Sequence, residues 1–121
     1  MISAAIQTTL EGIITDTFIA IGDEDIQVPF CVHQERETPI RLKEGIAGYA
    51  YDCDVAIVDD SPDDVNTYKG SIISALEALA GTTVESTVIN TVSYEGDDPD
   101  FDQESRLYTN ILRFYIETAN H

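Results

Sequence analysis

Positive charge is scarce in this sequence. Six Lys and Arg residues stand against 23 Asp and Glu residues, which gives a formal net charge of -17. Such a surface repels nucleic-acid phosphates and anionic lipid headgroups, so it argues against tight wrapping of DNA or RNA and against binding to an acidic membrane. Besides solubility, two uses of the acidity stay open: a partner with a basic surface, or a surface that DNA passes without sticking.

Long apolar runs and cysteines are scarce as well. No stretch approaches the ~20 apolar residues that span a bilayer, and no basic leader precedes an apolar run. We therefore expect no signal peptide, and a protein of the cytoplasm or of a particle assembled in the cytoplasm. The only two cysteines, Cys31 and Cys53, lie in apolar, strand-like segments. Buried free thiols are favoured there, although a disulfide stays open. With 121 residues and 43% hydrophobic composition, we expect a single domain over 1–121 that needs no metal or disulfide to fold.

Two segments have helical periodicity. Apolar residues recur every three or four positions between Ile2 and Ile14, which predicts an amphipathic helix. A second helix begins at Ser61-Pro62-Asp63-Asp64, where serine caps, proline suits the first helical position and aspartates suit the positive end of the helix dipole. Its apolar stripe runs from Val65 to Leu79, and Gly81 is predicted to end it.

The remaining apolar segments alternate like strands. The short apolar segment Phe18–Ile21 is followed by a turn at Gly22–Asp25. The predicted strands are Val28–His33, Ile46–Val58, Val84–Tyr94 (with Val88 and Val92 on one face) and Leu107–Thr118. Between them, Gln34–Gly45 is predicted as a loop or hairpin tip, and Glu95–Glu104 as an acidic loop. The order predicts an α+β fold: a mainly antiparallel (mixed) sheet of four to five strands with two helices packed on one face.

Two of the predicted strands are too long for the domain. A dozen residues span roughly 40 Å, whereas the radius of gyration expected at this size is about 14 Å. Such strands must bend sharply or project as a ribbon, and a projecting two-stranded ribbon is marginal in water without a partner. The sequence therefore favours assembly with other proteins.

Few residues point to catalysis. The two histidines are His33 and the last residue, His121, so a nucleophile–base pair would have to combine His33 with Cys31 on the same strand face. A packed cysteine beside a satisfied or solvent-facing histidine is the favoured interpretation. Glycine-rich phosphate loops and zinc-spaced cysteines are absent, so we expect no enzyme and no cofactor.

A partial calcium pattern occurs in the acidic segment. Asp98, Asp100 and Asp102 match the first three ligand positions of an EF-hand loop, but Gln103 stands where glycine is needed and Thr109 where glutamate is needed. We therefore expect no dedicated metal site. Loose binding of Mg²⁺ or Ca²⁺ stays open.

The cations are unevenly distributed. The first 35 residues contain none, whereas Arg36, Arg41 and Lys43 lie together in Gln34–Gly45. Local pairing with neighbouring glutamates is one interpretation. The other is that this segment reaches the acidic face of a neighbouring copy, giving head-to-tail contacts that close into a ring.

The pattern as a whole resembles the tail-completion, or tail-terminator, proteins of long-tailed bacteriophages and prophages, which join head and tail. The resemblance covers nearly the whole chain: the N-terminal helix, the short strand Val28–Val32, the long alternation Tyr49–Ile57, the turn Ser61–Asp64 into a helix, and the final strand Leu107–Thr118.

The resemblance implies a structural protein without enzymatic activity. Such a protein forms a ring, typically of six copies, at the head-proximal end of the tail tube, and it contacts the tube protein and the head-completion or connector protein. DNA would pass through the lumen without specific binding, and the protein would be found in the virion and, during assembly, in the host cytoplasm. The main alternative is an acidic DNA-mimic inhibitor of a nuclease or restriction enzyme, which the net charge of -17 supports equally. A small enzyme using Cys31 and His33 is a third.

Overall fold

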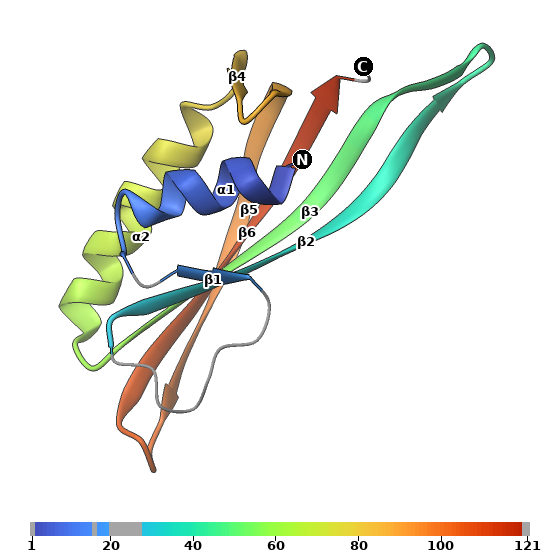
Figure 1. Ribbon diagram of the computed structural model, residues 1–121. Coiled ribbons are helices and arrows are strands. Elements are labelled where there is room, and N and C mark those ends of the chain that lie inside the picture. Colours follow the sequence, from blue (N-terminus) through green and yellow to red (C-terminus); the bar gives the residue numbers. More distant parts are fainter. Residues whose placement is uncertain (1, 16, 20–27, 120–121) are drawn as a thin grey trace.

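The computed structural model describes residues 2–15, 17–19 and 28–119. The predicted turn at Gly22–Asp25 lies outside them. The helices are α1 (Ile2–Glu11) and α2 (Pro62–Glu77), and the strands are β1 (Thr17–Ile19), β2 (Phe30–Leu42), β3 (Gly45–Asp59), β4 (Thr82–Val84), β5 (Thr87–Asp102) and β6 (Leu107–Ala119) (Figure 1). The strands form one sheet in the order β1-β2-β3-β6-β5-β4, in which only β1 and β2 are parallel neighbours. The predicted α+β class with a mainly antiparallel sheet is confirmed.

Both helices begin near the predicted positions and bury an apolar stripe against the sheet. The Ser61 hydroxyl accepts a hydrogen bond from the Asp64 backbone N–H at 3.3 Å, and Pro62 occupies the first helical turn of α2. Helix α2 ends at Glu77, earlier than the predicted stop at Gly81. Gly81 instead has a positive φ of 81° and donates its N–H to the Ile89 carbonyl at 2.8 Å, which leads the chain into β4.

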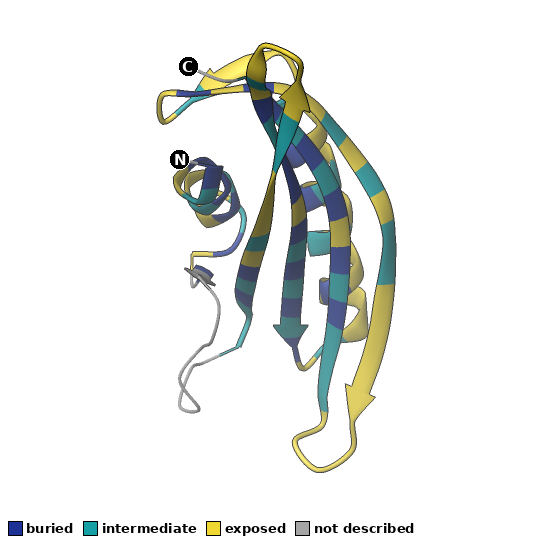
Figure 2. Cartoon of the chain, turned by 90° about the vertical axis from the view of Figure 1, so that its right-hand side faces the viewer, coloured by how far each residue is buried: buried dark blue, intermediate teal, exposed yellow. Residues whose placement is uncertain are grey.

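The core lies between the helices and one face of the sheet. In β3, the predicted alternation is confirmed: Tyr51, Cys53, Val55 and Ile57 are buried, whereas Asp52 and Asp54 lie on the other face. In β6, Leu112, Phe114 and Ile116 are buried in the same way. These residues join buried side chains of α1 and α2 in one hydrophobic cluster. Figure 2 shows the alternation as bands along the strands.

The charged segment Gln34–Gly45 is not a loop. Strand β2 continues to Leu42 and pairs with β3 down to Leu42 opposite Gly45, so only Lys43 and Glu44 form the turn. Of the two predicted alternatives, the hairpin tip is correct, and the loop is wrong for most of the segment. The polar side chains of this segment indicated a loop. A hairpin that is solvated on both faces needs no apolar face, however, because each strand obtains its backbone hydrogen bonds from the other strand.

The acidic segment Glu95–Glu104 is also mostly strand. Strand β5 extends to Asp102 and pairs with β6, with Phe101 opposite Tyr108. Beyond Ile89 its other edge has no neighbouring strand in the described sheet, so Pro99 costs no ladder hydrogen bond there. Carboxylates along an open edge also discourage pairing with foreign strands.

A bulge overturns the predicted face of β5. The register shifts between Ile89 and Thr91, so Ile89 is buried, Val92 packs against the core and Val88 is exposed. Val88 and Val92 therefore do not share a face. A bulge adds one residue to one strand and reverses the side-chain alternation beyond it.

The two long hairpins project from opposite ends of the sheet, as the strand lengths predicted. Strand β6 pairs with β3 only from Asp59 to Gly48. Beyond Gly48, toward the turn, β3 pairs with β2 alone, and the two form a two-stranded ribbon. The turn between β5 and β6 protrudes at the other end (Figure 1). Each hairpin end is exposed in Figure 2.

Candidate functional site

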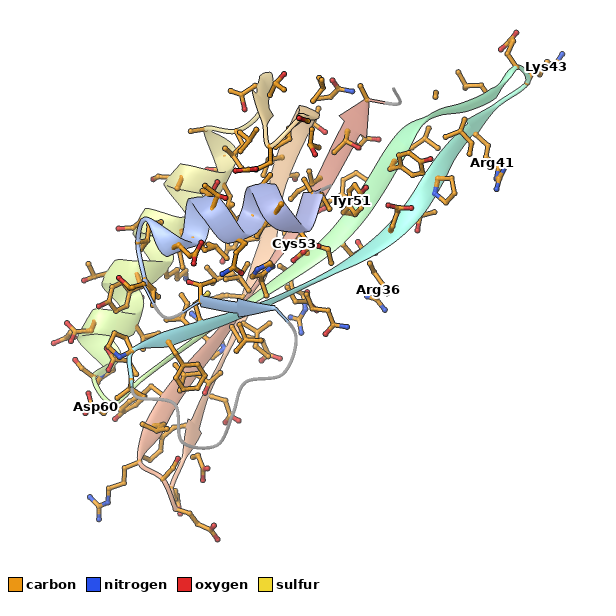
Figure 3. All side chains as sticks on the ribbon, viewed as in Figure 1. Arg36, Arg41, Lys43, Tyr51, Cys53 and Asp60 are labelled. Carbon is orange, nitrogen blue, oxygen red and sulfur yellow. The ribbon has the colours of Figure 1, made fainter. Side chains whose placement is uncertain are left out.

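The first candidate contact surface is residues 36–45 of the β2–β3 hairpin, here called the basic arm. Its tip projects past the end of β6, whereas Arg36, opposite Asp52, still lies where β3 pairs with β6. The arm carries Arg36, Arg41 and Lys43, all of them exposed (Figure 3). Within the described parts of the chain, none of the three cations forms an ion pair within 4.0 Å. The predicted local pairing with glutamates is therefore not formed, and the three charges face solvent.

Two of the other three cations form ion pairs within the fold. Lys69 of α2 contacts Asp97 of β5 at 2.8 Å, and Arg113 lies 3.6 Å from Asp98 and 4.0 Å from Asp54. The hydrogen bond from Lys69 lowers the pKa of Asp97, and the hydrogen bond from Asn110 lowers it further. These pairs join elements within the fold. The sixth cation, Arg106, is exposed in the turn before β6 and has no ion pair within the described chain, so three of the four unpaired cations lie on the arm.

The second candidate surface is the opposite end of the sheet, residues 95–106, here called the acidic hairpin. Its carboxylates at Glu95, Asp98, Asp100, Asp102 and Glu104 are exposed. Phe101 is 41% exposed and stacks on Tyr108 with ring centroids 4.5 Å apart. The protein therefore has a basic end and an acidic end, separated by the length of its longest strands.

The partial calcium pattern does not form an EF-hand loop. Asp98, Asp100 and Asp102 alternate along β5, with Asp98 beside Arg113. Across residues 2–15, 17–19 and 28–119, no three His, Cys, Asp or Glu side chains gather as metal ligands.

A buried polar network lies between α1 and β2. The ring of His33 is fully buried; its Nδ1 lies 2.7 Å from Glu35 Oε2, and its Nε2 lies 2.6 Å from Gln7 Oε1. Gln7 Nε2 donates to the Thr17 carbonyl at 2.8 Å, which turns Gln7 Oε1 toward the histidine. With the Gln7 amide in this orientation, His33 Nε2 donates to Gln7 Oε1.

This network connects distant parts of the chain. It joins α1, the start of β1 and the inner face of β2, and the Cys53 thiol of β3 lies 3.7 Å from the same Glu35 oxygen. The other carboxylate oxygen, Glu35 Oε1, is buried without a hydrogen-bond partner among the described residues. The predicted satisfied histidine is thus correct, and its partners fix how α1 packs on the sheet.

The cysteines are free and far apart along the strands. Cys31 is opposite Ile57, and Cys53 lies four residues further along β3, which is roughly 13 Å at the rise of a strand. A disulfide needs Cα atoms within about 7 Å, so the two cannot be bridged in this fold. Both ring nitrogens of His33 are occupied by Glu35 and Gln7. The nucleophile pair of Cys31 and His33 is not assembled.

Burial raises the pKa of the Cys31 thiol to about 12 and that of Cys53 well above its usual range. The thiolate is the reactive species, so its fraction at Cys31 should be about 1,000-fold below that of an unperturbed cysteine. We expect iodoacetamide at pH 8 to modify Cys31 at least that much more slowly in the folded protein than in urea, as followed by mass spectrometry. Equal rates in both conditions would restore the catalytic interpretation of Cys31.

A cavity between the start of α2 and the acidic hairpin had no signal in the sequence. It is lined by residues that are separated by up to 48 positions in the sequence, from Pro62 to Asn110. The pairing of His33 with Glu35 could have been found, because residues two apart on a strand share a face. The contact with Gln7 had no sequence signal.

In the part of the chain that the structure describes, no helix is both long and apolar enough to cross a membrane. No known family model matches the sequence, and no curated protein matches it. The fold is nevertheless shared with a solved chain from the virion of a native gene transfer agent particle. The two superpose with a TM-score of 0.77 over 97% of this chain and 93% of that chain, at 12% sequence identity. The likeness at this identity establishes a common fold.

Proposed function

We propose that this chain is a structural protein of a phage or a phage-like particle, acting as a tail terminator through a single domain over 1–121. Copies form a ring, with six as the expected number, at the head-proximal end of the tail tube, and the ring joins the tube to the head. The observation that carries the proposal is the fold shared over 97% of the chain with a protein of a gene transfer agent virion. The chain would act in the virion, after assembly in the host cytoplasm, and without catalysis.

The charge distribution supports ring formation. Arg36, Arg41 and Lys43 lie without ion pairs on the basic arm, and exposed carboxylates cover the acidic hairpin at the other end. A head-to-tail contact between unlike surfaces repeats from copy to copy and closes into a ring when the rotation allows it. We propose that the three cations of the arm contact the acidic hairpin of the next copy. The remaining negative charge would let DNA slide through the lumen without binding.

A DNA-mimic inhibitor is less well supported. A mimic needs an uninterrupted double row of acids, whereas the open sheet face mixes Asp52 and Asp54 with Arg36 and Arg113. The mimic also gives no role to an arm with three free cations.

Native mass spectrometry across protein concentration, with and without millimolar Mg²⁺ to screen the acidic repulsion, tests the proposal. We expect a closed oligomer, with a hexamer as the main species, and negative-stain microscopy should show rings with a central channel. A monomer or dimer that binds a basic nuclease tightly would instead support the mimic. The role at the tube is tested separately: particles assembled without this chain should carry tubes of uncontrolled length.

A further inference from the structure

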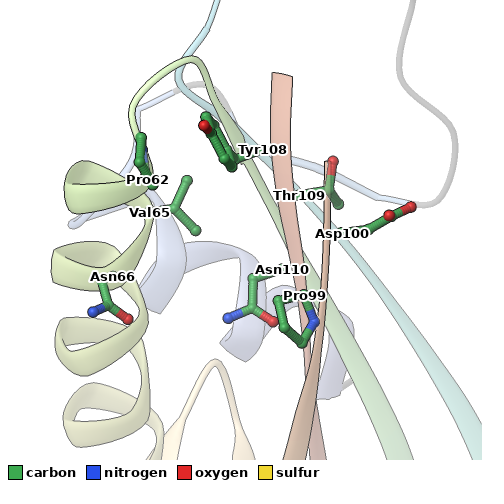
Figure 4. Close-up of a pocket in the computed structure, with 8 residues that line it drawn as sticks. All are labelled: Pro62, Val65, Asn66, Pro99, Asp100, Tyr108, Thr109 and Asn110. Carbon is green, nitrogen blue, oxygen red and sulfur yellow. The ribbon is translucent and has the colours of Figure 1, made fainter. Parts of the chain in front are cut away.

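A small cavity opens where α2 begins. Its lining comes from α2 (Pro62, Val65, Asn66), from β5 (Pro99, Asp100) and from β6 (Tyr108, Thr109, Asn110), as Figure 4 shows. Its volume is about 120 Å³. Sites for small-molecule ligands usually measure about 300–1,000 Å³. The cavity therefore suits one protruding side chain rather than a metabolite or nucleotide.

One polar side chain of the lining, Asn110, has an oxygen without a hydrogen-bond partner in the described chain. Asn110 is 5% exposed, and its Oδ1 is buried without a hydrogen-bond partner among the described residues. Its Nδ2 donates to Asp97 Oδ2 at 2.9 Å, which fixes the orientation of the amide because the opposite orientation would place two oxygens together. A buried acceptor without a donor is unfavourable.

The rim of the cavity is acidic. Asp100 belongs to the lining itself, and Asp60, Asp63 and Asp64 surround the start of α2. Within the described ranges, none of these four carboxylates has an ion pair. The combination of Pro62, Val65, Pro99 and Tyr108 inside with free carboxylates around them fits an apolar side chain that is flanked by cations.

The tip of the basic arm presents that combination. Leu42 is 61% exposed, the largest exposure among the large hydrophobic residues described as exposed. Its chain neighbours are Arg41 and Lys43. Leu42 is therefore free to contact another molecule between two unpaired cations.

Leu42 cannot reach the cavity of its own chain. It pairs with Gly45 at the beginning of β3, whereas the cavity adjoins Pro62, just after the end of β3 at Asp59. The 15 residues of β3 separate the two by about 45–50 Å. Only a second copy can supply the arm.

We infer that Leu42 of one copy enters the cavity between α2, β5 and β6 of the next copy, with Arg41 and Lys43 facing the acidic rim. The inference rests on the proposed ring and names both halves of its repeating contact. It predicts one contact per neighbouring pair, with the arm on one side and the cavity on the other. Burial of Leu42 would add apolar contact to an interface that is otherwise held by charge.

Disulfide trapping tests the contact. Leu42→Cys and Asn66→Cys variants, each made separately, are mixed under assembling conditions and oxidised. We expect a disulfide-linked dimer that dithiothreitol reduces to monomers. Such a link reports proximity, because a disulfide requires Cα atoms within about 7 Å. The matched control mixes Leu42→Cys with Glu77→Cys, which is exposed at the far end of α2 and should give no link above background. The native cysteines are buried and identical in every mixture.

A second pair of variants measures the energy of the contact. Leu42→Asp should weaken assembly at least 10-fold in native mass spectrometry, whereas Leu42→Met should assemble like the parent chain, because methionine keeps the apolar volume. The substitution site is exposed, so circular dichroism of both variants should match the parent chain.

The outcomes separate the inference from the proposed function. Rings that form without the 42–66 link, or that form equally well with Leu42→Asp, would overturn the inference and leave the ring intact. A link between two Leu42→Cys chains would show arms pairing with each other, which also overturns it. A chain that stays monomeric at every concentration would overturn the contact and the ring together.

Discussion

Replacement of His33 by alanine is expected to lower the free energy of unfolding by about 3–5 kcal/mol. The ring of His33 is fully buried, and the Glu35 side chain beside it is 2% exposed. Without the histidine, the carboxylate would stay buried with one oxygen already lacking a hydrogen bond. Gln7 would lose its partner as well, so α1 would be held less firmly. Urea unfolding followed by circular dichroism measures the change.

The control removes both His33 and Glu35 together. A His33→Leu/Glu35→Met double variant should lose less stability than His33→Ala, because apolar residues of similar size often replace a buried ion pair without cost. The stability loss of Gln7→Ala alone should lie between those of the double variant and His33→Ala, since Gln7→Ala breaks one hydrogen bond but keeps the contact between His33 and Glu35. If the free energy of unfolding of His33→Ala is within 1 kcal/mol of that of the parent chain, the network does not stabilise the contact between α1 and the sheet.

Neutralising the basic arm should have the largest effect on assembly. An Arg36→Gln/Arg41→Gln/Lys43→Gln variant is expected to associate roughly 10- to 100-fold more weakly, since each lost charge pair at an interface contributes up to about 1 kcal/mol. The three side chains form no ion pair within the described chain, so the stability of the monomer should not change. Native mass spectrometry and urea unfolding of the same samples distinguish the two effects.

The matched control has the same net charge. A Ser71→Glu/Thr83→Glu/Asn90→Glu variant adds three negative charges at exposed positions away from both hairpins, so it repels other copies by the same overall charge. It should assemble more readily than the neutralised arm. Equal weakening in both variants would show that total charge governs association, and the arm would then have no specific role.

Local chemistry was sufficient to predict much of this fold. The capped start of α2 at Ser61 and the alternation of β3 and β6 appear in the structure as expected, because capping and burial on one face depend on residues close in sequence. The length of the strands also predicted projecting hairpins, and the clustering of Arg36, Arg41 and Lys43 indicated the surface that the proposed ring uses.

The tertiary structure decided the rest. The segments 34–45 and 95–104 are polar enough to be loops, and they are strands because a neighbouring strand supplies their backbone hydrogen bonds. A bulge near Ile89 reversed the predicted face of β5. Gln7 meets His33, and Pro62 meets Pro99, only when the sheet brings distant segments together. The sequence by itself determined which residues carry charge and which are apolar, whereas long-range pairing determined which of them meet, because contacts between distant segments leave no periodic signal in the chain.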